Sequence, residues 1–462
     1  MHRLHSLTLG AVAAALTFAG SASAASLTRQ PYLQRVGMDT ATVAFRLDGS
    51  CVPTVSYGTQ GSTDQQARSA DGGRAHAIVL TGLQPGTEYT YVVDACGART
   101  SPKRFSTAPT PDSRSAHFIA VGDMGTGGTQ QRAVLDAMVR RQAELFLALG
   151  DIAYSSGTEE EFQNNFFAPM APLLSEVPAF TAPGNHEYVT NQAQPYLDNL
   201  YLPTSPSGGE RYYSFDWGPV HFVALDSNCV LGLASADRCT LAAQKQWAEQ
   251  DLAASRAPWK VVFFHHPPWS SGSHGSNLKN RREWAPLFEK YGVDLVLTGH
   301  DHHYERTYPM KGDGVASSGA QGIPYLVVGN GGASLRPISG GKPSWAAVRN
   351  DTDHGYLDVR VAGGTLTAQV LTPSGKALDS FTLTKDVPAT PSGQQPSPSQ
   401  PSAGNPTPYP PGPVAGGPSL PDGSDVGDLG PESAGCSTAP VAALLPAGLL
   451  LLAGALRRRR QR

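Results

Sequence analysis

The sequence contains few charged residues and almost no excess of either sign. Asp, Glu, Lys and Arg make up 16% of its 462 residues, and the formal net charge at pH 7 is −3. Proteins that hold nucleic acid by its phosphates carry a basic excess, so we expect no nucleic-acid binding. The length exceeds that of one typical domain. The many glycines (50) and prolines (38) indicate loops and a linker.

Cysteine is also scarce, with five residues in the chain. Cys51 and Cys96 lie in one segment, and Cys229 and Cys239 enclose a short loop. These spacings predict two structural disulfides, with Cys436 left over. Five unrelated buried thiols are the alternative, which fits an exported protein less well.

Both ends of the chain differ in composition from its middle. Residues 1–24 have a basic start, an apolar centre and the pattern Ala22-Ser23-Ala24, which is typical of a secretory signal peptide. A buried N-terminal helix is the alternative. Residues 387–435 are rich in Pro, Ser, Gly and Gln and should form a disordered linker. We therefore expect an exported protein, at the cell surface or outer envelope or extracellular.

Residues 436–462 contain a cysteine, an apolar stretch and a basic end, Arg457–Arg460. This layout resembles a bacterial C-terminal sorting signal of the MYXO-CTERM type, which implies processing near Cys436 and retention at the cell surface. An ordinary transmembrane tail anchor is the alternative, although Pro440 and Pro446 interrupt the apolar stretch. The expected partner of this segment is the membrane or a sorting protease.

Residues 26–109 have the pattern of an all-β domain. Alternating or β-branched runs at Ala41–Arg46, His76–Leu80 and Tyr89–Val93 are separated by turn residues, which predicts a small sandwich. Leu83–Tyr89 resembles the corner of a fibronectin type III domain, in which a tyrosine closes the strand. Nothing in this segment indicates catalysis.

Residues 114–386 alternate strand and helix patterns, which predicts a layered α/β domain. A helical stripe at Thr129–Glu144 separates the strands His117–Val121 and Leu145–Leu149, so these strands should be parallel. Further strands are expected at 220–225, 259–264, 295–297, 324–328, 357–361 and 365–371, and further helices at 241–255 and 280–291.

Seven side chains of metal-ligating types lie directly after the predicted strands, close to the carboxyl end of each strand. They are Asp123, Asp151, Tyr154, Asn185, His265, His300 and His302. The carboxyl ends of parallel strands share one edge of a sheet, so we expect these side chains to converge there. The neighbouring glycines should let the backbone turn sharply. Seven N and O ligands are too many for one ion and suit two metal ions that share a bridging carboxylate.

The motifs around these residues occur in a specific order. They are Gly122-Asp-x-Gly125, Gly150-Asp-x-x-Tyr154, Gly184-Asn-His-Glu187, His265-x-Pro267 and Gly299-His-x-His-x-Tyr-Glu-Arg306. This order resembles the calcineurin-like metallophosphoesterase superfamily, and Tyr154 and the preceding β-rich domain resemble its purple acid phosphatase branch. The resemblance implies a four-layer α/β metallophosphoesterase sandwich with the metal site at strand C-terminal ends, preceded by a small all-β fibronectin-like sandwich.

The resemblance also implies a role for each ligand. The first metal, ferric iron, would be held by Asp123, Tyr154 and His302, and Asp151 would bridge the two ions. The second metal, a divalent iron, zinc or manganese ion, would be held by Asn185, His265 and His300. His266 is the alternative to His265.

Further residues would contact substrate or support the ligands. His186 and His274, together with Asn185, would bind the phosphate or the leaving group, although Gly275 replaces a second histidine of plant members. His303 falls outside the ligand pattern and should be structural or at the rim. Tyr304, Glu305 and Arg306 should support the ligands. Core or rim packing is expected for Trp269 and Tyr188, and a tight loop, not a phosphate cradle, for Gly329–Gly332.

The ligand types then predict the chemistry. Two cations a few ångströms apart lower the pKa of a shared water, so that a metal-bound hydroxide attacks phosphorus in line with the ester oxygen. His274 or His186 would protonate the departing alkoxide. We thus expect an exported dinuclear-metal acid phosphatase, a metal-dependent phosphoric ester hydrolase that acts on phosphate monoesters. A phosphodiesterase on the same site and an inactive surface-binding protein are the alternatives.

Overall fold

A computed structural model describes residues 25–206, 209–318 and 321–387. The predicted signal peptide, the linker from residue 388 onward and the segment with Cys436 lie outside these residues. Among the described helices, none combines the length and the apolar character that crossing a membrane requires.

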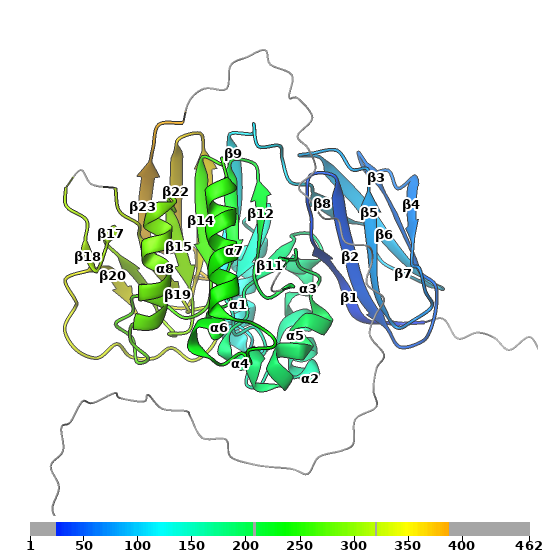
Figure 1. The fold of residues 1–462 in the computed structure, drawn as a ribbon. Coiled ribbons are helices and arrows are strands. Elements are labelled where there is room, and N and C mark those ends of the chain that lie inside the picture. The colour runs from blue at the N-terminus through cyan, green and yellow to red at the C-terminus, as the bar shows by residue number, and fades with distance from the viewer. Residues whose placement is uncertain (1–24, 207–208, 319–320, 388–462) are drawn as a thin grey trace, which may run out of the picture. The chain divides into compact units, whose positions relative to one another are not determined.

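The N-terminal domain is a sandwich of two antiparallel sheets, drawn in blue in Figure 1. One sheet has the strand order β1-β2-β5, and the other has the order β4-β3-β6-β7, with β8 also paired to β6. The predicted strands at 41–46, 76–80 and 89–93 correspond to β2, β5 and β6. The strand bounds are β1 (Leu27–Gln34), β2 (Thr40–Leu47), β3 (Thr54–Thr59), β4 (Gln65–Arg68), β5 (Ala75–Thr81), β6 (Glu88–Ala95), β7 (Ala98–Arg99) and β8 (Lys103–Ser106).

Two predicted local features of this sandwich are present. The Tyr89 hydroxyl, at the start of β6, accepts a hydrogen bond of 2.9 Å from the Gln84 N–H, which closes the expected tyrosine corner. Cys51 and Cys96 form the first predicted disulfide. The likeness of the domain to fibronectin type III stays a prediction.

The second domain contains two mixed sheets. The first sheet has the order β11-β10-β9-β21-β22-β23, in which β9, β10 and β11 are parallel. The second has the order β12-β13-β14-β15-β19-β16-β20, in which β13, β14, β15 and β19 are parallel. The strand bounds are β9 (Ser115–Val121), β10 (Leu145–Ala148), β11 (Ala179–Thr181), β12 (Tyr213–Trp217), β13 (Val220–Ala224), β14 (Trp259–Phe263), β15 (Leu295–Thr298), β16 (Tyr304–Thr307), β17 (Met310–Lys311), β18 (Gly314–Val315), β19 (Tyr325–Val328), β20 (Ala346–Asn350), β21 (Tyr356–Ala362), β22 (Thr365–Leu371) and β23 (Ala377–Thr384).

Helices connect these strands. Their bounds are α1 (Thr129–Val139), α2 (Glu159–Glu161), the π-helix η1 (Phe162–Phe167), α3 (Ala168–Leu174), α4 (Asn185–Val189), the 3-10 helix η2 (Asn191–Ala193), α5 (Gln194–Asn199), α6 (Ser227–Leu231), α7 (Leu241–Ala254) and α8 (Leu278–Lys290). Side-chain caps start the two long helices, because Thr240 accepts from the Ala243 N–H and Asn277 from the Asn280 N–H. Cys229 and Cys239 form the second predicted disulfide, between α6 and α7.

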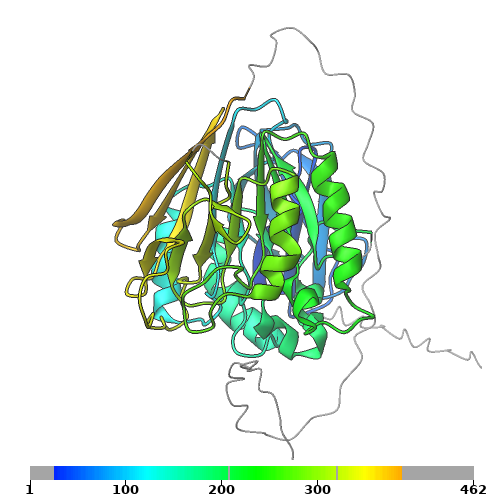
Figure 2. The same ribbon diagram turned by 60° about the vertical axis from the view of Figure 1, so that its left-hand side comes forward.

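The two sheets pack face to face, and helices cover their outer faces (Figures 1 and 2). The rings of Phe118 on β9 and Phe222 on β13 meet edge to face at 5.1 Å across this interface. Successive residues on a strand point to opposite faces, so Val262 instead packs outward into the cluster that contains Phe288 of α8. On the other side, the Tyr356 hydroxyl of β21 donates to a carbonyl oxygen of α1 at 3.3 Å. The predicted four-layer α/β architecture is therefore correct.

The predicted helix 129–144 is too long at its C-terminal end. Helix α1 ends at Val139, and Gln142 has a left-handed backbone with φ 52°. The chain must turn there to enter β10, and the Glu144 carboxylate accepts the Trp217 indole N–H at 2.8 Å. The tertiary contact outweighs the helical propensity of this segment.

A buried arginine joins the two domains. Arg29 of β1, 2% exposed, donates to Gln163 Oε1 at 2.7 Å and to Glu159 Oε1 at 3.0 Å, and it also contacts Asn199 Oδ1. Glu161 lies two residues after Glu159 on α2, and its carboxylate accepts the backbone N–H groups of Ser155 and Ser156 at 2.6 and 3.0 Å. The sandwich therefore contacts the helix that holds the loop directly after Tyr154.

Candidate metal centre

The seven predicted ligands converge where two sheets meet. Asp123, Asp151, Tyr154 and Asn185 follow β9, β10 and β11 of the first sheet, whereas His265, His300 and His302 follow β14 and β15 of the second. The prediction that all seven ligands share one edge of a single sheet was therefore incomplete, because three of them come from the second sheet. Because the strands of both sheets carry these residues at their carboxyl ends, two edges face each other across the centre.

The backbone turns at the ligands themselves. Asp123, Asp151 and His300 have φ angles of 56°, 52° and 73°, a left-handed conformation that non-glycine residues adopt rarely and often at functional sites. The prediction assigned these turns to the adjacent glycines, and Gly150, directly before Asp151, does have a positive φ of 90°. Gly299 instead provides space, since a Cβ there would lie 2.5 Å from Asp123 Oδ2.

Three side chains form one donor set. Tyr154 Oη lies 3.1 Å from Asp123 Oδ1 and 3.1 Å from His302 Nε2. The remaining pair, His302 Nε2 and Asp123 Oδ1, is 3.6 Å apart. Two ligand atoms about 2.1 Å from one ion are about 3.0 Å apart at a right angle and about 3.4 Å apart in a tetrahedron. The observed spacings are thus those of atoms arranged around one cation.

Three other side chains form a second donor set. Asn185 Oδ1 lies 3.2 Å from His265 Nε2 and 3.0 Å from His300 Nδ1. Asp151 Oδ2 connects the two sets, because it lies 3.2 Å from Tyr154 Oη and 3.1 Å from His265 Nε2. One carboxylate oxygen therefore lies between the two sets, as a bridging ligand requires.

Backbone carbonyls fix the imidazole rings. His265 Nδ1–H donates to the Leu149 carbonyl at 2.8 Å, and His302 Nδ1–H donates to the Ser334 carbonyl at 2.9 Å. A carbonyl oxygen only accepts, so in both rings Nδ1 carries a proton and Nε2 is the atom left to bind a metal ion at the centre. Such support is typical of metal-binding histidines.

The electrostatics of the centre favour bound cations. Burial raises the pKa of Asp123 well above its usual value, and burial together with Asp123 and Asp151 raises the pKa of Tyr154. Burial acts against charge on His265 and Asp151 too, but their mutual attraction raises the pKa of His265 to about 10 and lowers the pKa of Asp151. Clustered buried anions of this kind need positive charge nearby, so the donor set fits metal ions.

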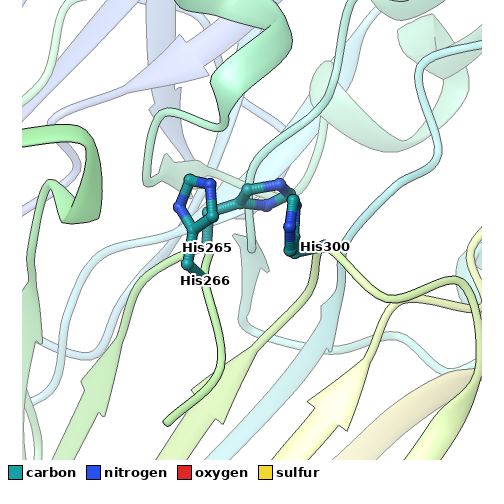
Figure 3. A group of neighbouring side chains, drawn as sticks. All are labelled: His265, His266 and His300. Carbon is teal, nitrogen blue, oxygen red and sulfur yellow. The ribbon is translucent and has the colours of Figure 1, made fainter. Parts of the chain in front are cut away.

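His266 lies beside this centre. Figure 3 shows the imidazoles of His265, His266 and His300 close together, and nitrogen atoms of the three lie within 4.8 Å of one another. His266 Nδ1, however, lies 2.8 Å from Ser227 Oγ, whereas His265 Nε2 faces Asp151 and Asn185. This geometry favours His265 over His266 as the ligand.

The two predicted catalytic histidines flank the centre. His186 Nδ1–H donates to the Ser155 carbonyl at 2.5 Å, and its Nε2 lies 3.9 Å from Asp151 Oδ2. His274 is exposed, and its ring stacks on that of His300 with a centroid distance of 4.3 Å. Both imidazoles are thus next to predicted ligands, one beside each donor set.

The remaining predictions near the centre were partly correct. Glu305 supports the His274 loop by accepting the Ser271 N–H at 2.7 Å, whereas Tyr304 and Arg306 bind Asp379 of β23 on the other face. His303, Trp269 and Tyr188 are buried, which matches structural roles. The Gly329–Gly332 loop is the expected tight loop, and the Ala333 N–H that follows it donates to the Asp123 carbonyl at 2.8 Å.

Sequence reasoning missed three residues that shape the centre. The Glu187 carboxylate accepts four backbone N–H groups, from Asp151, Ile152, Ala153 and Gly184, at 2.7–3.1 Å. Asp301 accepts the His274 N–H at 3.0 Å. Arg336 contacts His274 Nε2. Glu187 lies in the quoted Gly-Asn-His-Glu motif, three residues after Gly184, a spacing typical of helix N-terminal capping; no local signal marks Arg336.

Family models match both domains. Residues 116–304 match the calcineurin-like phosphoesterase family, and residues 24–113 match a family described as a domain of unknown function (DUF7800). "Probable inactive purple acid phosphatase 1" of Arabidopsis thaliana is 27% identical over 368 residues, which cover 68% of this chain and 58% of that protein. "Acid phosphatase type 7" of Mus musculus is 26% identical over 326 residues, which cover 63% of this chain and 72% of that protein.

A solved structure is also similar. The purple acid phosphatase from yellow lupin (Lupinus luteus) seeds has a TM-score of 0.66 at 21% identity, and the match covers 77% of this chain and 74% of the lupin chain. At this identity the likeness concerns the fold.

Proposed function

We propose that this protein is a dinuclear-metal acid phosphatase that hydrolyses phosphate monoesters, because residues 116–304 match the calcineurin-like phosphoesterase family and the chain is similar to acid phosphatases. The observation that carries the proposal is the position of Asp151 Oδ2 between two three-residue donor sets. A single-metal or purely structural site has no use for two complete sets joined by one carboxylate.

The donor types suggest which ions bind. Asp123, Tyr154 and His302 provide two anionic oxygens and one imidazole, a set that suits ferric iron. Asn185, His265 and His300 provide one neutral oxygen and two imidazoles, a set that suits divalent iron, zinc or manganese. When bound, the two cations would acidify a water that attacks phosphorus and would neutralise phosphate oxygens.

The chain's own groups would handle the leaving alcohol. As the water oxygen bonds to phosphorus, the ester P–O bond breaks and its electron pair stays on the ester oxygen. That oxygen needs one proton, which His274 at the exposed edge of the second donor set, or His186 beside Tyr154, would supply. The products are an alcohol and inorganic phosphate.

Substitution of the bridging carboxylate tests the proposal. We expect Asp151→Asn to lower 4-nitrophenyl phosphate hydrolysis at least about 100-fold, since the bridging charge is lost. Asp136→Asn, on the exposed face of α1, is the matched control and should leave activity unchanged. Full activity of Asp151→Asn would rule out the enzymatic assignment and favour the inactive surface-binding alternative.

The role of His274 has its own test. A general acid matters most when the leaving group is a poor one. We expect His274→Ala to lower hydrolysis of an alkyl phosphate much more than hydrolysis of 4-nitrophenyl phosphate. Equal losses on both substrates would indicate that His274 binds substrate without donating the proton. The same comparison for His186→Ala shows whether His186 donates the proton instead.

A visible spectrum tests the ferric assignment. Tyrosinate bound to ferric iron absorbs visible light by charge transfer, so purified protein should be coloured and Tyr154→Phe colourless. A colourless, fully active protein that contains only zinc or manganese would contradict the assignment.

We also propose that the protein is exported. The leader pattern of residues 1–24 supports this proposal, and so do the disulfides Cys51–Cys96 and Cys229–Cys239, which persist in oxidising compartments. Activity should be measurable on intact cells or in the medium. Activity confined to the cytosolic fraction would contradict export.

A further inference from the structure

We propose that Arg336 binds the outward-facing oxygen of a metal-bound phosphate and thereby makes the site select phosphate monoesters over diesters. This inference rests on the proposed function, because it assigns a substrate contact at the same centre. Neither the ligand motifs nor their spacing includes Arg336.

The backbone around Arg336 is fixed to the predicted ligands. After the Gly329–Gly332 loop, the Ala333 N–H donates to the Asp123 carbonyl at 2.8 Å, and the Ser334 carbonyl accepts His302 Nδ1–H at 2.9 Å. The Arg336 N–H then donates to the His302 carbonyl at 3.1 Å. Three consecutive contacts therefore hold this segment against the first donor set, so the place of Arg336 follows from the metal loops.

The Arg336 side chain extends to the edge of the second donor set. Its guanidinium contacts His274 Nε2, and the His274 ring stacks on that of His300 at 4.3 Å. The guanidinium is half-buried beside the two imidazoles. It thus lies near both donor sets, on the side of the centre where His274 is exposed.

The charge of Arg336 is not neutralised by a carboxylate within the described part of the chain. Some arginines of this domain bind a carboxylate, such as Arg306 with Asp379 at 2.6 Å and Arg141 with Asp358 at 2.7 Å. Arg336 instead faces an imidazole nitrogen, which is a weaker acceptor than an anionic oxygen. A phosphate oxygen at this position would therefore draw the guanidinium away from His274, whose Nε2 would then be able to take up the proton that it gives to the ester oxygen.

The chemistry of the two ester classes explains the selectivity. A monoester dianion has three non-bridging oxygens, and two bound cations would neutralise two of them. The third oxygen would keep its charge, and the planar guanidinium fork of Arg336 would bind it. A diester places its second ester group there, which has no charge to offer and leaves the guanidinium without its partner. Sites built to bind a polar group reject analogues that lack it.

The first experiment compares two esters with the same leaving group on the metal-loaded full-length protein. The substrates are 4-nitrophenyl phosphate and bis(4-nitrophenyl) phosphate. We expect Arg336→Gln to lower kcat/KM for the monoester about 10- to 100-fold and for the diester less than about threefold. Arg336→Lys keeps the charge but loses the planar fork, so its kcat/KM for the monoester should lie between those of wild type and Arg336→Gln.

A matched control separates the local contact from loss of positive charge. Arg360 on β21 is exposed, forms an ion pair of 3.8 Å with Asp358, and lies opposite His117 of β9 in the strand register, at the end of the sheet away from Asp123. Arg360→Gln removes the same charge far from the centre and should leave both activities unchanged. Equal losses on the two esters in Arg336→Gln, or no loss on either, would overturn the inference.

A binding measurement keeps the test independent of catalysis. Titration calorimetry with inorganic phosphate should show affinity about 10- to 100-fold weaker for Arg336→Gln than for wild type, at equal metal content by mass spectrometry. If wild type hydrolyses neither ester, the proposed function and the selectivity both fail, while an Arg336-dependent phosphate affinity still supports the contact between Arg336 and phosphate. Equal phosphate affinity in wild type, Arg336→Gln and Arg336→Lys would overturn it. The lysine variant also serves if the glutamine variant does not fold.

Discussion

Replacing Glu187 by glutamine should loosen the two loops that carry Asp151 and Asn185. Glu187 is fully buried, and each of its carboxylate oxygens accepts two backbone N–H groups. In Glu187→Gln, the amide oxygen keeps two of these bonds. The amide NH₂ faces the other two N–H groups, which then have no acceptor.

The size of the effect follows from these contacts. A buried N–H group without an acceptor costs about 1–3 kcal/mol, so two of them cost about 2–6 kcal/mol. For a domain of this size that corresponds to a drop in Tm of roughly 3–10 °C. Loss of a group that holds ligand loops also lowers metal affinity about 10- to 100-fold.

Two assays check this prediction. Differential scanning calorimetry gives Tm, and plasma mass spectrometry gives metal content after dialysis against dilute metal. Glu160→Gln is the control, because Glu160 is exposed on α2 and the same substitution there should be neutral. If Glu187→Gln has the Tm and metal content of the control, the four N–H contacts do not support the loops and the reasoning is wrong.

Three further predictions concern other parts of the molecule. His221 pairs with Asp216 and Asp251 at 2.7 and 2.9 Å, and although burial acts to lower it, these carboxylates raise the pKa of His221 to about 9. The stabilisation by protonated His221 is complete below about pH 6.5 and is lost as the pH rises through 9. The Tm difference between wild type and His221→Gln should therefore shrink over that range, and a constant difference would contradict this prediction. Removal of metal by a chelator should lower Tm, because the buried Asp123 carboxylate then loses its counter-charge, and added metal should restore Tm. A Tm that does not change with metal would contradict the assignment of a metal centre. Arg29→Met should speed hydrogen exchange of the amides held by Glu161, and unchanged exchange would show that Arg29 does not support that loop.

Much of the fold and of the candidate centre was predictable because each signal is local. The strands at 117–121 and 295–297 are short apolar runs followed at once by a polar ligand type, and both the run and its end can be read from neighbouring residues. The order of the motifs then indicated which residues come together. The two disulfides followed from spacing in the same way.

The rest depends on contacts between distant segments. That the ligands come from two facing sheets is set by packing such as Phe118 against Phe222, and no local pattern specifies that contact. Arg336 lies 62 residues from His274, and their contact requires the whole path of β15, β16 and β19. The early end of α1 also depends on a distant partner, Trp217. Such features require the assembled fold.

The contact between Arg29 and Glu159 has a consequence for how such proteins evolve. The partners of Arg29 are spread over α2, η1 and α5 of the second domain, so a foreign sandwich would leave Glu159, Gln163 and Asn199 without their cation. Exchange of domains by recombination would therefore damage the loop after Tyr154 even if both halves folded. We expect the two domains to be inherited together, with Glu159 changing only together with Arg29 and Arg46, the two arginines of the sandwich that bind it.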